Sequence, residues 1–182
     1  MFKERKAAQM AAVLLGKAGG SLNVLKLTKL LYLAERESMS RSGFPIAGDY
    51  MVSMPKGPVL SQTLNLTNGE VVSEDWEHWV EDRENHQVKL KRPFTREDVD
   101  SLSDAAMDVL NDVWKQFGEM TQWDLVEYTH NECAEWEDPG KSSHPIPAKR
   151  VFIALGKSKE EAEILTRELQ AQKYFDCLLE GA

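Results

Sequence analysis

KLTKLLYLAERESMSRSGFPIAGDYMVSMPKGPV, residues 26–59, is the stretch that decides the fold. Its first half places Leu27, Leu30 and Leu31 on one face of a helix. Gly43 ends this pattern, because glycine is the favoured residue just beyond a helix C-terminus. The stretch therefore predicts an amphipathic helix that buries its leucine face in a core.

The second half of the stretch is short, β-prone and rich in turn residues. Tyr50 to Ser53 lie between Gly48 and Pro55 and predict a strand. Proline suits the first position of a helix, so we expect a brief helix from Pro58 to about Leu66.

Further helices are indicated on both sides of this stretch. The run ERKAAQMAAVLLGK precedes Gly19 and Gly20 and predicts an N-terminal helix. Ser103 and Thr121 are suitable N-caps for DAAMDVLNDVWKQF and QWDLVEYTHN. AKRVFIAL predicts a short helix, and Ser158 with Glu161 forms a capping box that opens a C-terminal helix.

Residues 75–93 carry two β-like runs, WEHWVED and HQVKLKR, around a turn at Arg83, Glu84 and Asn85. We expect a hairpin that joins the strand at Tyr50 to Ser53 in a small antiparallel sheet. The predicted fold is mainly α, bordering on α+β: a single helical domain over residues 1–182, with this sheet inserted after the N-terminal helices.

Charge is distributed unevenly along a chain whose net charge is -8. Residues 1–42 hold eight lysines and arginines against three glutamates, whereas residues 70–138 hold twenty acidic residues against six basic ones. An acidic surface repels phosphate backbones and attracts basic partners. A solvated face that keeps the protein soluble is the alternative explanation.

Compartment and membrane association are constrained by the sequence. No run of about 18 apolar residues is present, and the N-terminus has no apolar core of a secretory signal. Cys133 and Cys177 are the only cysteines, too few for a disulfide framework. We expect a cytoplasmic protein without membrane contact.

Residues able to perform chemistry are sparse. His130 and Cys133 have a spacing that suits zinc or a nucleophilic pair, but a structural zinc site needs four ligands and no paired ligand lies near Cys177. GKAGGS lacks the pattern of a phosphate-binding loop. We expect no enzymatic activity, no metal and no cofactor.

Residues 21–42 are similar to part of a helix-turn-helix, and the later hairpin suits a wing. The basic residues in this region, Lys26, Lys29, Arg36 and Arg41, are few, and the protein as a whole is acidic. DNA binding is therefore expected to be weak or absent, although a winged-helix regulator is kept as an alternative.

Three segments in this order, KLTKLLYLAERE, GDYMVSMPKGPV and WDLVEYTHNECAEW, resemble the Panacea domain, the SocA-like antitoxin family once filed under phage-associated proteins of unknown function. The resemblance covers about residues 5–178, and the combination is more specific than any one segment. Two departures are small: Met54 and Pro55 stand where many relatives carry another pair, and the acidic hairpin region is particular to this chain.

The resemblance implies an antitoxin of a bacterial, phage or prophage toxin–antitoxin system that neutralises a cognate toxin by protein–protein binding. Relatives are not known as enzymes. An adaptor that delivers its partner to a protease is a further alternative. The identity of the toxin and the oligomeric state are left open.

The expected site residues fall into two groups. A structural motif maintains the fold around the turn and consists of Lys26, Leu30, Tyr32, Thr129 and His130. The expected partner contacts are Lys56, Gly57, Pro58, Trp76, Trp79 and Trp136, with Trp76 and Trp79 as exposed anchors of an acidic hairpin that receives a basic toxin. Trp114 and Trp123 are expected in the core.

Overall fold

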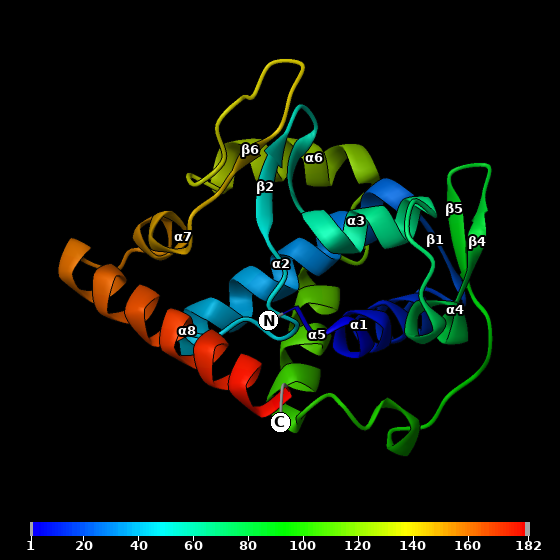
Figure 1. The fold of residues 1–182 in the computed structure, drawn as a ribbon. Coiled ribbons are helices and arrows are strands. Elements are labelled where there is room, and N and C mark those ends of the chain that lie inside the picture. Colours follow the sequence, from blue (N-terminus) through cyan, green and yellow to red (C-terminus); the bar gives the residue numbers. More distant parts are fainter. Residues whose placement is uncertain (1, 181–182) are drawn as a thin grey trace.

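The computed structural model describes residues 2–180 and shows a mainly α fold with two small antiparallel sheets (Figure 1). This confirms the predicted fold class. Within the described residues the helices are α1 (Glu4–Lys17), α2 (Val24–Ser42), α3 (Ser61–Asn68), α4 (Glu74–Trp79), α5 (Asp104–Phe117), α6 (Gln122–Glu132), α7 (Ala148–Ala154) and α8 (Lys159–Glu180). A 3₁₀ turn, η1 (Glu97–Val99), precedes α5. None of these helices is both long and apolar enough to cross a membrane.

Helix α2 forms the centre of the molecule. Asn23 caps its N-terminus by accepting a hydrogen bond from Leu25 N, and Gly43 ends it in the left-handed region at φ 80°. Helices α1, α3, α5 and α6 pack around it, so leucines on more than one of its faces are buried. A helix that is apolar on most of its circumference belongs in a core.

One sheet has the strand order β3-β2-β6 and contains β2 (Met51–Met54), β3 (Gly57–Leu60) and β6 (His144–Pro145). Met54 pairs with Gly57, so Pro55 and Lys56 form a two-residue turn. The predicted strand and the brief helix after it are confirmed, but the predicted start of this helix at Pro58 is wrong. Pro58 lies inside β3 and the helix begins at Ser61, because β3 pairs with β2 before the chain turns.

The other sheet has the order β1-β5-β4 and contains β1 (Ser21–Asn23), β4 (Val80–Glu84) and β5 (Gln87–Leu90). Asn85 and His86 form its hairpin turn at positive φ, 51° and 61°. The hairpin therefore exists, but its predicted partner is wrong. It pairs with β1 rather than with the strand at residues 51–54.

The hairpin is also shorter than predicted, because the run WEHW is helix α4 and not strand. Ser73 caps α4 by accepting a hydrogen bond from Trp76 N. Trp76 and Trp79 are each only 5% exposed and belong to the core against α1. The expectation that they are exposed anchors is wrong.

The C-terminal part forms a helical arm. Helix α7 packs against α8, which extends along the molecule toward the start of α1 (Figure 1). Lys3 and Asp176 pair at 2.9 Å and connect these two ends. Ser158 and Glu161 form the predicted capping box of α8.

Candidate functional site

The three segments of the sequence motif meet at the β2–β3 turn. The Lys29 ammonium of α2 is completely buried and donates a hydrogen bond to the Pro58 carbonyl at 2.7 Å. This bond fastens β3 to the central helix. Lys29 was counted among the basic surface residues of a helix-turn-helix, and the structure corrects that assignment.

Gly57 lies directly above the Lys29 ammonium and has no space for a side chain. A Cβ atom at this position would stand 2.6 Å from Lys29 Nζ and 2.6 Å from Thr129 Oγ1. The His130 ring is also close, with Cδ2 at 3.3 Å from the same point. Gly57 has φ 92°, which disfavours any other residue. The turn therefore rests on α2 and α6 together.

His130 and Trp136 hold the other side of this turn. Their rings stack with centroids 4.0 Å apart and an interplanar angle of 14°. The Trp136 indole N–H donates to the Met54 carbonyl at 3.0 Å. Trp136 was expected to contact a partner, whereas the structure places one face of its ring on His130 and its polar atom on the turn.

A buried ion pair supports the same region from α2. Glu135 is completely buried and accepts hydrogen bonds from Tyr32 Oη at 2.5 Å and Arg36 Nε at 2.6 Å. Burial raises the pKa of Tyr32 well above its usual value, and the Glu135 charge adds to the effect. The Tyr32 phenol therefore stays protonated and donates to the carboxylate.

Lys26 and Leu30 complete the expected structural motif. Lys26 Nζ donates to the Gly118 carbonyl at 2.5 Å and lies 5.7 Å from the centroid of the Trp114 ring. Leu30 is completely buried. These two residues connect α2 to the α5–α6 corner and to the core, not to the turn.

Burial of Lys29 has a consequence for stability. Desolvation lowers its pKa from the ordinary value of 10.5 to about 7. Above pH 7 the unfolded chain therefore holds a proton that the folded chain releases. The free energy of unfolding should rise with pH between about 7 and 10, by at most about 1.4 kcal/mol per pH unit.

We expect the Lys29→Met variant to lose this rise, because methionine fills the site without a titrating group. Urea denaturation at several pH values between about 7 and 9.5 measures the free energy of unfolding of both proteins. Lys159→Met, at an exposed lysine on α8, serves as the control and should keep the wild-type slope. If the free energy of unfolding rises equally with pH in wild type and Lys29→Met, the lowered pKa does not belong to Lys29.

A groove with a volume of about 570 Å³ opens beside this turn. The first residues of α2 and α6, the β2–β3 turn, α3 and the tip of the β4–β5 hairpin surround it. The apolar side chains that line it are Val24, Leu25, Met54, Pro55, Val59, Leu64 and Trp123. This is the size and character of a ligand or side-chain recognition site.

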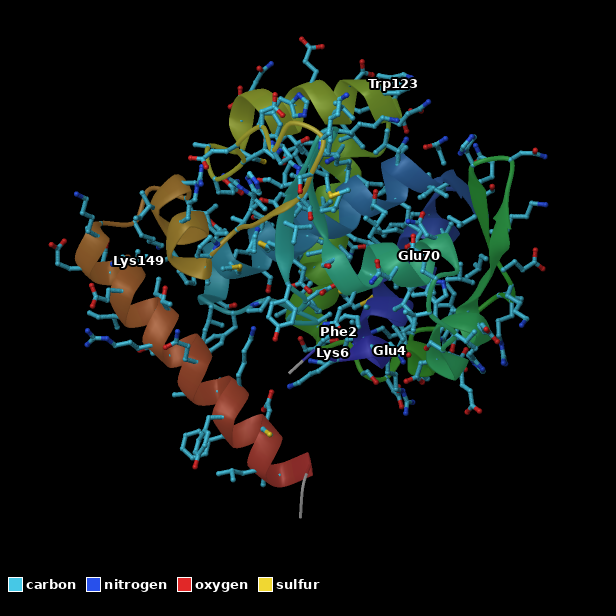
Figure 2. All side chains as sticks on the ribbon, turned by 45° about the horizontal axis from the view of Figure 1, so that its top comes forward. Phe2, Glu4, Lys6, Glu70, Trp123 and Lys149 are labelled. Atoms are coloured by element: carbon cyan, nitrogen blue, oxygen red, sulfur yellow. The ribbon has the colours of Figure 1, made fainter. Side chains whose placement is uncertain are left out.

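Trp123 and Lys56 form the outer rim of the groove. Trp123 is 57% exposed, and Figure 2 shows it at the surface of α6. Its expected place in the core is therefore wrong, because the buried face of α6 carries Leu125 and Thr129, on a different side of the helix from Trp123. The exposed Lys56 holds its ammonium 5.4 Å from the centroid of the Trp123 ring. Gly57 lines the groove, whereas Pro58 is buried in β3.

Cys133 and His130 do not form a reactive pair in this arrangement. Burial raises the pKa of the Cys133 thiol to about 12, so it remains protonated at neutral pH. His130 Nε2 is buried without a hydrogen-bond partner among residues 2–180, and burial lowers the pKa of its ring. Over the same range, no three His, Cys, Asp or Glu residues gather in a way that suits a metal ion.

Helix α2 does not have the exposure of a DNA-recognition helix. Arg41 and Ser42, at its C-terminal end, are the only α2 residues classed as exposed. A recognition helix enters the major groove with several side chains of one face, and here those faces are covered by other helices. The winged-helix alternative loses its main support.

Comparison with known proteins identifies one family. The model of the family described as "antitoxin SocA-like, Panacea domain" matches residues 27–137. This range begins in the first turn of α2 and ends one residue after Trp136. No curated protein and no solved structure matches the chain.

Proposed function

Because this chain belongs to the SocA-like antitoxin family with the Panacea domain, we propose that it is the antitoxin of a bacterial or phage toxin–antitoxin pair and neutralises its toxin by direct binding. One observation carries the proposal: the residues that the sequence motif brings together build the wall of an open, largely apolar groove. We assign a binding role to this arrangement, because the Cys133 thiol stays protonated and does not form a reactive pair with His130.

The groove has the properties of a protein-recognition site. An exposed tryptophan beside an apolar depression is a frequent hot spot of binding energy. Gly57, Pro58 and Lys29 fix the backbone beside it, so little conformational entropy is lost when a partner binds. We therefore place toxin binding at Trp123, Lys56 and the neighbouring groove.

Co-expression with the product of the adjacent reading frame tests the proposal. The wild-type protein should restore growth in cells that produce this toxin. Trp123→Ala should weaken binding of the purified toxin by about 2 kcal/mol or more and abolish the rescue, because the variant loses the aromatic wall of the groove. Circular dichroism establishes that the variant is folded.

Tyr174→Ala is the matched control. Tyr174 is an aromatic residue of similar exposure, 64%, on α8, which lies outside the residues matched by the family model. We expect this variant to rescue growth fully. If Tyr174→Ala fails and Trp123→Ala succeeds, the binding surface is α8 and the groove assignment is wrong.

The adaptor alternative predicts a different fate for the toxin. Under direct neutralisation the toxin accumulates in an inactive complex with this protein. Under delivery to a protease the toxin disappears when this protein is present and reappears when cellular proteases are deleted. Immunoblotting of the toxin in both strains decides between the two.

A further inference from the structure

The groove differs in charge from the rest of the chain. The protein carries 30 acidic residues against 22 basic ones. Among the described residues that line the groove, however, Lys56 and His86 are present and neither Asp nor Glu occurs. A partner segment that enters the groove therefore meets a local environment opposite in sign to the net charge of -8.

The N-terminal end of α2 adds to this positive potential. The first residues of α2 and the first residues of α6 both line the groove. The N-terminal end of a helix carries a partial positive charge and favours a neighbouring anion. The neutral Asn23 caps α2, and no acidic residue lies in its first turn, whereas the Asp124 carboxylate accepts from Thr121 N at 2.8 Å and offsets the positive end of α6.

Lys29 lies behind the same turn, with its Nζ at 2.6 Å from the point where a Cβ atom of Gly57 would stand. Burial lowers the pKa of Lys29 to about 7, so this side chain adds little positive charge above neutral pH. The positive charge of the groove therefore comes from Lys56 and from the N-terminal end of α2.

Lys56 is also positioned in a way that suits recognition of an anion. Its ammonium stays near the Trp123 ring, 5.4 Å from the centroid, which keeps the charge at the rim of the apolar lining. A carboxylate next to an apolar side chain therefore finds both a cation and an apolar wall within the same groove.

We propose that the groove receives an apolar segment of the toxin that carries a carboxylate, with the apolar side chains against Trp123 and Leu64 and the carboxylate at Lys56. This inference rests on the proposed function and specifies its partner chemistry. It replaces the expectation of a basic segment, which was derived from an acidic tryptophan hairpin that the structure does not contain.

A pair of dyes tests the charge preference without knowledge of the toxin. Anilinonaphthalene sulfonate (ANS) has an apolar ring system with one anionic group, and phenylnaphthylamine has the same ring system without the charge. We expect the folded wild-type protein to bind ANS more tightly than phenylnaphthylamine in a fluorescence titration. ANS should also shift the indole N–H resonance of Trp123, which the Trp123→Phe variant identifies in a proton–nitrogen NMR spectrum.

Charge reversal at the rim is the decisive variant. Lys56→Glu should weaken ANS binding about tenfold, because it replaces an attraction by a repulsion, and should change phenylnaphthylamine binding by less than about twofold. Lys159→Glu changes the net charge equally on α8 and should leave both affinities unchanged. Near-UV circular dichroism excludes dye binding to a partly unfolded variant.

The outcomes separate this inference from the proposed function. Equal binding of both dyes, or an ANS affinity insensitive to Lys56→Glu, overturns the anion preference even if growth rescue succeeds. ANS binding that shifts Trp123 and depends on Lys56 supports the groove chemistry even if the neighbouring protein proves not to be the toxin. Absence of binding by either dye overturns the groove as a recognition site for apolar anions.

Discussion

Replacing Gly57 with alanine should destabilise the protein by about 3 kcal/mol. The new methyl group would stand 2.6 Å from both Lys29 Nζ and Thr129 Oγ1, well inside van der Waals contact. It would also force a residue with a side chain into φ 92°. Urea denaturation followed by circular dichroism measures the change in the free energy of unfolding.

Gly69→Ala is the control that separates the steric clash at Gly57 from the cost of the positive φ angle. Gly69 also has a positive φ, 72°, but no atom lies within 4 Å of the place of its Cβ. We expect a cost of about 1 kcal/mol there, from the dihedral preference alone. If both variants lose the same amount, the packing of Gly57 on α2 and α6 contributes nothing to stability.

Toxin binding should respond to the two glycine variants in the same order as stability does. Gly57 joins the buried motif to the groove, because it touches Lys29 and Thr129 on one side and lines the groove on the other. A displaced turn moves Lys56 relative to Trp123. Gly57→Ala should therefore weaken toxin binding at temperatures where the variant is still folded, whereas Gly69→Ala should not.

Local signals made the helices predictable. Asn23, Ser103 and Thr121 cap the helices that their sequence neighbourhood indicates, and Gly43 ends α2 as expected. The strand at residues 51–54 was also indicated by its residues. These features depend on interactions within a few residues, so the sequence contains them directly.

Pairing between distant segments was less predictable. The run WEHWVED suits a strand by composition, but Ser73 caps the segment and α1 covers both tryptophans, so WEHW becomes a helix. Similarly, Pro58 suits a helix start, but pairing of β3 with β2 keeps it extended. Tertiary contacts overrode local preference in both places.

The residues of the candidate site were even less predictable from local sequence patterns. Lys29 and Glu135 are completely buried charged residues that no local pattern distinguishes from surface ones. One signal was available: α2 carries leucines on several faces, which indicates a helix surrounded by others. Trp123 was misplaced because helical spacing in α6 does not tell which face is covered.

The net charge of the chain does not predict the charge inside the groove. A chain at -8 suggests attraction of a basic partner, and the steering of a partner at long range follows this overall field. Recognition inside the groove depends on nearby groups, and these are Lys56 and the N-terminal end of α2. A toxin that is basic overall and presents one acidic, apolar segment satisfies both requirements.

Arg36→Met should cost about 3 kcal/mol in the free energy of unfolding. Glu135 is completely buried, and Arg36 is the cation that pairs with it, at 2.6 Å. The variant leaves a buried carboxylate with the Tyr32 hydroxyl as its remaining side-chain donor among the described residues. Methionine keeps most of the apolar volume of arginine, so the loss reports the charge and not a cavity.

Two further variants test whether the loss of stability in Arg36→Met comes from the uncompensated buried charge of Glu135 and not simply from the loss of an arginine. Arg41→Met removes an arginine from the same helix whose side chain is 41% exposed and pairs with Glu37 and Asp112, so we expect a cost below about 1 kcal/mol. In the double variant Arg36→Met with Glu135→Gln, the uncompensated charge is gone and Tyr32 keeps an acceptor. This double variant should recover at least about half of the loss. If it is less stable than Arg36→Met alone, Arg36 acts through packing, and the ion pair does not hold the motif segment of Glu135 and Trp136 against α2.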